Sequence, residues 1–374
     1  MNTLTSTGPA SQFGWFQSTH HAIRQGGVTA VAQHDFKRYL QQNEVTLGLH
    51  DDAQDQFKAG PAHYINLEDA RNESVNPYSL AQSANSSKLH IDSYRVPWPD
   101  LMQRLSLDKQ QQLAEAWQVR SLKETDLPKG TTAYDSVLHH TNQLIAALAT
   151  PHPNATSAQL EQAHQLVQYH AGALAHYVGD IYMPLHSTHT FNWSLAPNYA
   201  NLHPDLGQGI HAFIEGDVLK PGDYAALQQE ALVPMQLSKD TLKPFLLEAI
   251  QASHLRVFDL LQANQHVVMA DPYRVVNRPT EFKAALRQAL LPLVKSQVLQ
   301  AQQAYGAILS MAFEEAQRFE NAHKQYELKT HNYAVNDTLP MPAASQPLPV
   351  EKEDSAEDEG EEPSLMEDTV IASQ

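Results

Sequence analysis

Cysteine is absent from the 374 residues of the sequence. Disulfide bonds and thiolate metal sites are therefore excluded, and histidine and carboxylate side chains remain as the candidate metal ligands. Long apolar runs are also missing, since no segment approaches the ~18 consecutive apolar residues of a membrane-spanning helix. The N-terminal residues lack the basic start and apolar core of a Sec signal peptide. We therefore expect a cytoplasmic protein, a protein exported without such a signal, or a chain trimmed at its start.

Positive charge is scarce, because 25 Lys and Arg residues face 42 Asp and Glu residues, for a net charge of −17. Binding of nucleic acid or anionic lipid through a general basic surface relies on many Lys and Arg contacts to phosphate. This chain is not expected to bind in that way. Chemistry on a phosphate ester would therefore require bound cations.

The negative charge is concentrated near the C-terminus, where residues 351–368 carry ten Asp or Glu residues and one Lys. A segment with so much charge and so few apolar residues is expected to be disordered. We predict three parts: an N-terminal extension at 1–14, one large helical domain at 15–334 and a disordered acidic tail at 335–374.

Strand-like alternation is scarce in the central part, where apolar residues recur at helical spacing instead. This pattern predicts an all-α fold, and Ser157 is the predicted N-cap of one long helix. Long irregular segments are expected at about 48–100 and 186–210. The predicted helices cover about 104–118, 135–149, 157–182, 211–219, 240–267 and 281–326.

The stretch HYVGDIYMPLHSTH, residues 176–189, concentrates candidate ligands at a helix end. His176 and Asp180 are four residues apart, so both side chains leave the same helix face and can bind one cation. Gly179 allows another group to approach the helix closely. Pro184 should end the regular helix and bring His186 to the same place.

A second pair with this spacing, His211 and Glu215, follows in GIHAFIEGD. Upstream, THHAI contains His20 and His21, and GLHDDAQDQFKAGPAHYINLEDA contains further His and Asp residues. Two helical pairs and a loop histidine indicate more than one metal ion. Nitrogen and oxygen ligands without sulfur favour zinc, in a catalytic site more than in a structural one.

These segments resemble, in order and spacing, the zinc-dependent phospholipase C and S1/P1 nuclease superfamily over residues 15 to 220. GWFQSTHHAI is similar to the opening segment of that family, LHDDAQ to its aspartate segment, and LAHYVGDIYMPLH and IHAFIE to its two helical ligand blocks. The resemblance implies an all-α domain with three zinc ions in a cleft. The implied metal ligands are Trp15, His20, Asp51, His63, His176, Asp180, His186, His211 and Glu215.

By the same resemblance, Asp51, His63, His176 and Asp180 would surround one zinc. Asp180 would bridge to a second zinc bound by His20 and Trp15, and the third would lie between the remaining ligands, His186, His211 and Glu215. The paired zinc ions would lower the pKa of a shared water, which Asp51, as the catalytic base, would orient or deprotonate.

Several alternatives remain open. Asp52 could replace Asp51, and His203 could replace His211, although Gly207 stands where a carboxylate would follow His203. Trp15 lies behind fourteen residues, so either the chain is cleaved after Gly14 or that zinc is bound differently, with His21 as a substitute ligand.

Many of the other histidines lie outside the implied ligand set. His170 is expected to pack against its neighbours or to make a hydrogen bond behind the ligands. The pair His139 and His140 is expected on a helix surface.

The resemblance implies an enzyme acting on phosphodiesters. Glu215 favours the bacterial phospholipase C branch, with a phospholipid such as phosphatidylcholine as substrate, whereas the Trp15 to His20 spacing and AHYINLEDA are similar to the single-strand nucleases and 3′-nucleotidases. A binding protein with a degenerate site is a third class. The Glu-rich C-terminus resembles translocation signals of bacterial type IV secretion substrates, so secretion into a host cell as an effector is expected.

Overall fold

The structure, a computed structural model, describes residues 17–55, 60–65, 123–127, 132–149, 155–188, 209–230, 232 and 234–330. The chain divides into a first unit, Met1–Lys324, and a second unit, Gln325–Gln374, of which the described part is the end of the last helix. Helices and turns make up the described residues, which contain no β-strand. The prediction of an all-α fold is therefore confirmed for this part of the chain.

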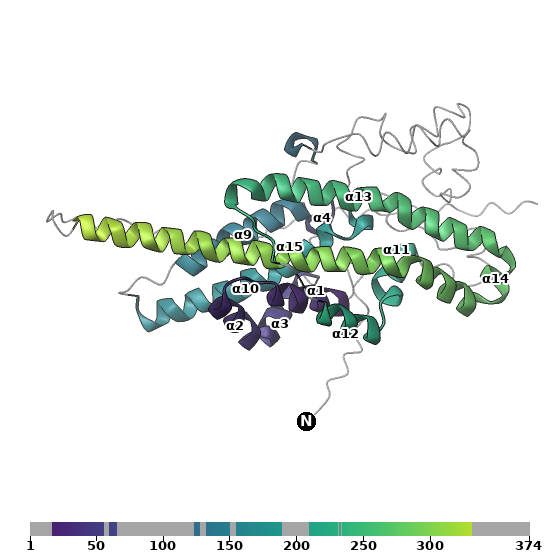
Figure 1. Cartoon of the computed structure of the whole chain (residues 1–374), viewed down its shortest axis with the longest axis horizontal. Helices are drawn as coiled ribbons and strands as arrows, with labels where there is room; N and C mark the ends of the chain where they lie inside the picture. Colours follow the sequence, from purple (N-terminus) through teal and green to yellow (C-terminus); the bar gives the residue numbers. More distant parts are fainter. Residues whose placement is uncertain are drawn as a thin grey trace, which may run out of the picture. The chain divides into compact units, whose positions relative to one another are not determined.

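The helices follow one another along the sequence and carry the labels of Figure 1. They are α1 Gln17–Thr29, α2 His34–Gln42, α3 Glu44–Gln54, α4 Gly60–His63, the 3₁₀ turn η3 Glu124–Asp126, α9 Ala133–Ala149, α10 Ser157–Ile181, the 3₁₀ turn η4 Pro184–Ser187, α11 Ile210–Phe213, the π-helical turn η6 Ile214–Val218, α12 Pro221–Gln229, α13 Lys239–Ala270, α14 Pro272–Asn277 and α15 Pro279–Thr330.

Five of the six predicted helices coincide with helices or helical turns of the structure. The sixth, at 104–118, lies outside the described residues, as do the N-terminal extension 1–14 and the acidic tail 335–374. The loop predicted from residue 48 is wrong at its beginning, because α3 continues to Gln54 and α4 follows at Gly60. Apolar Leu47 is buried in this helix, and buried Asp51 and Gln54 lie among its last residues, so the polar sequence concealed a packed helix.

Helix α10 is the central element of the site. Its N-cap is Thr156, whose hydroxyl accepts a hydrogen bond from the Gln159 backbone, while the Gln159 side chain accepts one from the Thr156 backbone. The predicted cap, Ser157, is one residue away and is the first helical residue. All residues from His170 to Ile181 are buried, and α10 packs against α9, α3 and α1. Polar side chains on this half of α10 therefore lie inside the protein.

A glycine sets the distance between α3 and α10. A Cβ atom on Gly172 would lie 2.6 Å from the Leu47 carbonyl oxygen and 2.7 Å from the His50 Cβ. Only a residue without a side chain allows this approach. The close packing brings the last turns of α3 beside the buried half of α10.

The turn η4 is held by hydrogen bonds on both sides. The Ser187 hydroxyl donates to the Pro184 carbonyl oxygen at 2.6 Å, and the ring of His254, on α13, lies 3.0 Å from the Ser187 carbonyl oxygen. The Ile65 backbone N–H donates to the His186 carbonyl oxygen at 2.8 Å. The chain after Pro184 is thus fixed between α13 and the segment that follows α4.

Candidate metal centre

Polar side chains from separate helices meet around the end of α10. The eight predicted ligands that the structure describes are at most 5 % exposed. They are His20, Asp51, His63, His176, Asp180, His186, His211 and Glu215. The remaining predicted ligand, Trp15, lies outside the described residues, as does His203.

Asp180 lies at the middle of this group. Its Oδ2 is 2.9 Å from His63 Nδ1 and 3.6 Å from His176 Nε2. Its Oδ1 is 3.1 Å from His186 Nδ1 and 3.9 Å from His20 Nε2. Each carboxylate oxygen therefore faces two imidazole rings, an arrangement that can join two cation sites through one side chain.

A first candidate site lies on the Oδ2 side of Asp180. His63 Nδ1 and His176 Nε2 are 3.1 Å apart, and Asp55 Oδ1 is 3.6 Å from the same His176 nitrogen. Burial raises the pKa of Asp55 to about 7. The three side chains offer ligand atoms close enough to one another to bind one metal ion.

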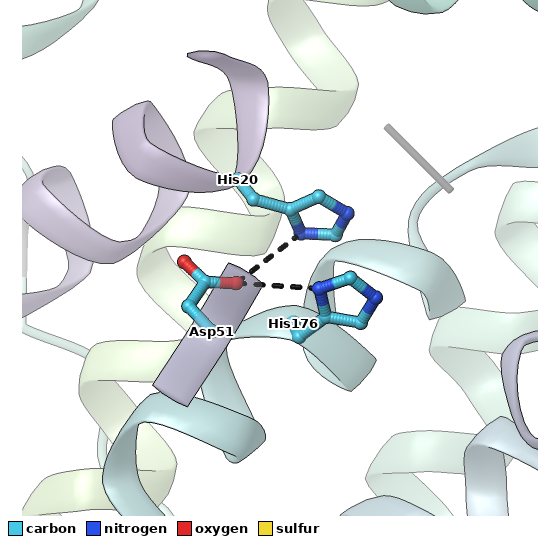
Figure 2. A group of neighbouring side chains, drawn as sticks. All are labelled: His20, Asp51 and His176. Atoms are coloured by element: carbon cyan, nitrogen blue, oxygen red, sulfur yellow. Dashed lines mark ion pairs between the residues drawn. The ribbon is translucent and has the colours of Figure 1, made fainter. Parts of the chain in front are cut away.

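A second group joins α1, α3 and α10 (Figure 2). Asp51 Oδ1 lies 3.3 Å from His176 Nδ1 and 3.9 Å from His20 Nδ1, and the two imidazole rings are stacked with centroids 4.0 Å apart. The other oxygen of Asp51 accepts a hydrogen bond from Arg24, which also donates to Glu44.

A third group consists of His186, His211 and Glu215. His186 Nε2 and His211 Nε2 are 3.2 Å apart, and Glu215 Oε1 lies 2.7 Å from His211 Nε2 and 3.4 Å from His186 Nε2. His211 comes from α11, and Glu215 comes from the π-helical turn that continues it. Single π-helical turns are frequent at functional sites.

Several buried atoms of these groups have no hydrogen-bond partner among the described residues. A buried polar atom without a partner costs about 1–3 kcal/mol, so several of them in one place are unfavourable unless a ligand binds there. Cations satisfy such a set of nitrogen and oxygen lone pairs. The groups can therefore hold metal ions. The atoms are both ring nitrogens of His20, Nδ1 of His176 and His186, and Oδ1 of Asp51, Asp55 and Asp180.

Burial and charge act in opposite directions on these groups. Burial lowers the pKa of His20 well below its usual value. Burial also opposes protonation of His176 and His186, but Asp180 and nearby carboxylates outweigh it and raise the pKa of each to about 9. The pKa of Asp180 is held well below its usual range, against the effect of burial, because histidines surround it. Metal binding must therefore displace protons from His176 and His186.

The observed neighbours of His63 differ in one carboxylate from the ligand grouping that the family resemblance implies. Asp51 faces Nδ1 of His176, whereas His63 faces the opposite nitrogen of that ring, where Asp55, the residue directly after α3, is the neighbouring acid. We had no expectation for Asp55 or Arg24. Asp51 and Asp55 are four residues apart, so the spacing applied to the two His pairs also contained the signal for Asp55.

Two further expectations can be compared with the structure. His21, considered as a substitute ligand, is partly exposed and lies 3.0 Å from Asp52, so its ring is engaged outside the central group. The expectation that His140 lies on a helix surface is wrong, because its side chain is buried against α10 and shares a 3.0 Å hydrogen bond with His170. His170 packs against Tyr169, in line with the expectation that it packs against its neighbours.

The pair of His140 and His170 should affect stability in acid. Burial lowers the pKa of His140 to about 3 and that of His170 to about 4. Both rings are therefore neutral in the folded protein, whereas the unfolded chain binds protons below about pH 6.5. The contribution of these two neutral rings to the free energy of unfolding is fully present above about pH 6.5 and is lost as the pH falls towards 4. We predict that His170→Gln reduces the loss of unfolding free energy between pH 7 and 5 by about 2 kcal/mol.

Urea unfolding at several pH values would measure this difference. His34→Gln is the control, because the His34 side chain is 83 % exposed. Equal pH slopes for wild type and His170→Gln would contradict the prediction.

Gly179 allows His20 to lie against α10. A Cβ atom at this position would be 2.8 Å from His20 Nδ1 and 3.2 Å from Ile23 Cδ1. Because His20 is also stacked on His176, it cannot move aside freely. We predict that Gly179→Ala weakens binding of Zn²⁺, used as a probe ion, by about 10-fold or more, since displaced ligands lose metal affinity. Gly222→Ala is the matched control, because a Cβ atom there meets nothing within 4 Å. Equal zinc affinity of the two variants in a chelator competition would refute the prediction.

A search against protein-family models finds no match for this chain, and a search of curated proteins finds no significantly similar sequence. None of the helices among the described residues is long and apolar enough to cross a membrane. Support for a metal centre therefore comes from the burial, distances and donor atoms of these side chains.

Proposed function

We propose that this chain is a zinc-dependent phospholipase C that hydrolyses the glycerol-side phosphodiester bond of phospholipids such as phosphatidylcholine. The products would be diacylglycerol and a phosphorylated headgroup. The observation that carries the proposal is the position of Asp180, each of whose oxygens faces two buried histidines. A shared carboxylate of this kind is suited to a site with adjacent metal ions, which is a common arrangement for phosphoester hydrolysis.

The donor set supports zinc as the bound ion. Imidazole nitrogens and carboxylate oxygens converge without sulfur ligands, and most of them are buried. We propose three zinc ions per chain, held in the neighbourhoods of His63 with His176, of His20 with Asp180, and of His186 with Glu215. When bound, zinc supplies a Lewis acid for phosphoryl oxygens and lowers the pKa of water.

The side chains of the proposed site would bind and orient the substrate phosphate, although the protein as a whole is acidic. Buried carboxylates hold the histidine rings in place, and the deep burial of the ligands keeps competing water from them. The net charge of −17 weighs against a polymer of nucleic acid as substrate, because general phosphate binding needs a basic surface.

Parallel assays with two substrates test the proposal. The zinc-loaded protein is incubated with phosphatidylcholine vesicles and, separately, with single-stranded DNA, and the phosphate-ester products are measured. Phosphocholine and diacylglycerol are expected, with DNA left intact. Cleavage of DNA with intact lipid would replace the phospholipase by the nuclease alternative, and no cleavage of either by zinc-loaded protein would refute both.

A further inference from the structure

The two stacked histidines present their ring nitrogens in the same order (Figure 2). Nδ1 of His20 and Nδ1 of His176 both face Oδ1 of Asp51, at 3.9 Å and 3.3 Å. Nε2 of each ring instead faces Asp180, at 3.9 Å and 3.6 Å. One carboxylate thus lies at the Nδ1 edge of both rings, and a different one lies at the Nε2 edge.

The side chain of Asp51 is held by the guanidinium group of Arg24. Its Oδ2 accepts a hydrogen bond from Arg24 Nη1, and Arg24 is only 2 % exposed. The Nε and Nη2 groups of Arg24 donate to Glu44 Oε1 at 3.1 Å and 2.9 Å. The side chain of Asp51 is therefore oriented by a guanidinium that is itself held by a second carboxylate, which leaves Oδ1 aimed at the two rings.

The surroundings of the two nitrogens of His176 differ. Nε2 has His63 Nδ1 at 3.1 Å, Asp55 Oδ1 at 3.6 Å and Asp180 Oδ2 at 3.6 Å, so several ligand atoms converge there. Nδ1 has one carboxylate oxygen, Asp51 Oδ1, at 3.3 Å, and His20 Nδ1 lies 3.9 Å from the same oxygen, a smaller set that could also hold an ion. A metal-binding imidazole uses one nitrogen for the ion and donates the other N–H to an acceptor, which fixes its tautomer and orientation.

We propose that Asp51 is a positioning residue that orients both His20 and His176, and that Asp55 supplies the carboxylate ligand beside His63. In the metal-bound protein, the Nδ1–H groups of both rings would be directed at Asp51 Oδ1, which lies 3.3 Å from His176 Nδ1 and 3.9 Å from His20 Nδ1, and both Nε2 atoms would be free for metal ions. A carboxylate oxygen can accept two such hydrogen bonds. This inference rests on the proposed metal centre and refines it. One acid on α3, Asp51, would orient two metal-binding histidines through the Nδ1 edge of each ring.

Metal titration of three aspartate variants tests the inference. Zinc stoichiometry and affinity are measured by competition with a chromophoric chelator for Asp51→Asn, Asp55→Asn and Asp52→Asn, the last being the matched control that neighbours Asp51. Asp55→Asn is expected to bind one zinc fewer per chain. Asp51→Asn is expected to keep the wild-type stoichiometry at saturating zinc, with affinity reduced about 10- to 100-fold. Arg24 would donate to the amide oxygen, so the NH₂ donor would face the rings and disfavour the required tautomer.

Cobalt absorption gives a second measurement, since its visible bands report on the ligands of the ion. The spectrum of the Co²⁺-loaded protein should change in Asp55→Asn and keep its wild-type form in Asp51→Asn. Arg24→Lys, which keeps the charge but loses the paired contacts, should weaken zinc binding in the same direction as Asp51→Asn. Because several variants are compared, the inference can still be tested if one of them does not fold.

The outcomes separate the inference from the proposed function. Loss of one zinc and a changed cobalt spectrum in Asp51→Asn, with neither in Asp55→Asn, would make Asp51 the ligand and overturn the inference. Unchanged zinc affinity in Asp51→Asn would also overturn it. A wild-type protein that binds zinc as described but cleaves no phospholipid would refute the phospholipase while leaving the roles of Asp51 and Asp55 standing.

Discussion

Replacing Asp180 with asparagine is expected to abolish hydrolysis and to remove metal from the centre. Each carboxylate oxygen of Asp180 faces two histidines at 2.9 to 3.9 Å, whereas an asparagine would offer one acceptor and a donor NH₂ group. The NH₂ group would point at imidazole nitrogens that are needed for metal binding. We expect at least about 10³-fold lower activity, equivalent to about 4 kcal/mol of transition-state stabilisation, and a lower zinc content per chain.

The measurement combines phospholipid hydrolysis with elemental analysis of zinc after dialysis. Asp52→Asn is the control, because its carboxylate is partly exposed and pairs with His21 outside the central group. The zinc of the third group, His186, His211 and Glu215, should be retained better than that of the sites that Asp180 would join, since these three residues offer ligand atoms for one ion without Asp180. Full activity of Asp180→Asn with wild-type zinc content would eliminate the metal-dependent mechanism.

The candidate ligands that could be paired from the sequence are those whose neighbours are set by local geometry. His176 with Asp180, and His211 with Glu215, are each separated by one helical turn, so recognising the helix was enough to pair them. Pro184 ended α10 as expected, and the following turn carries His186 to within 3.1 Å of Asp180. In these cases, the separation along the sequence determines which side chains lie next to each other.

Pairings between helices could not be predicted in the same way. Whether Asp51 or Asp55 lies beside His63 depends on the rotation of α3 against α10, which is fixed by the close contact at Gly172. Arg24 is buried by Asp51 and Glu44, which lie 27 and 20 residues away along the chain. Such contacts follow from packing, and packing is not encoded in residue spacing alone.

The histidine pair between α9 and α10, His140 and His170, illustrates the same limit. The sequence HH at 139–140 is typical of a polar helix surface, and His139 and His140 could not be distinguished by composition. In the fold, α9 packs on α10 and buries His140, where the ring of Tyr177 stacks on it at 5.5 Å and His170 supplies its hydrogen-bond partner. Burial of one of two neighbouring identical residues required the position of another helix.

Removal of metal is expected to destabilise the protein strongly. Without cations, the centre places four carboxylates in a buried region, those of Asp51, Asp55, Asp180 and Glu215. Protonated His176 and His186, whose pKa values are raised to about 9, compensate only in part. A ligand present at 1,000 times its dissociation constant contributes about 4 kcal/mol of stability per site. Chelation should therefore lower the apparent Tm of the zinc-loaded protein by at least about 10 °C, the shift expected from the loss of one such site.

Thermal unfolding with and without a chelator measures this shift, and the variants of the same centre supply its control. Asp180→Asn should show a smaller decrease on chelation than wild type, because it has less zinc to lose. Gly222→Ala should show the full decrease, since it alters a position with no neighbour within 4 Å. A wild-type Tm that is unchanged by chelation would mean that these buried carboxylates and histidines are satisfied without metal, and the assignment of the centre would then fail.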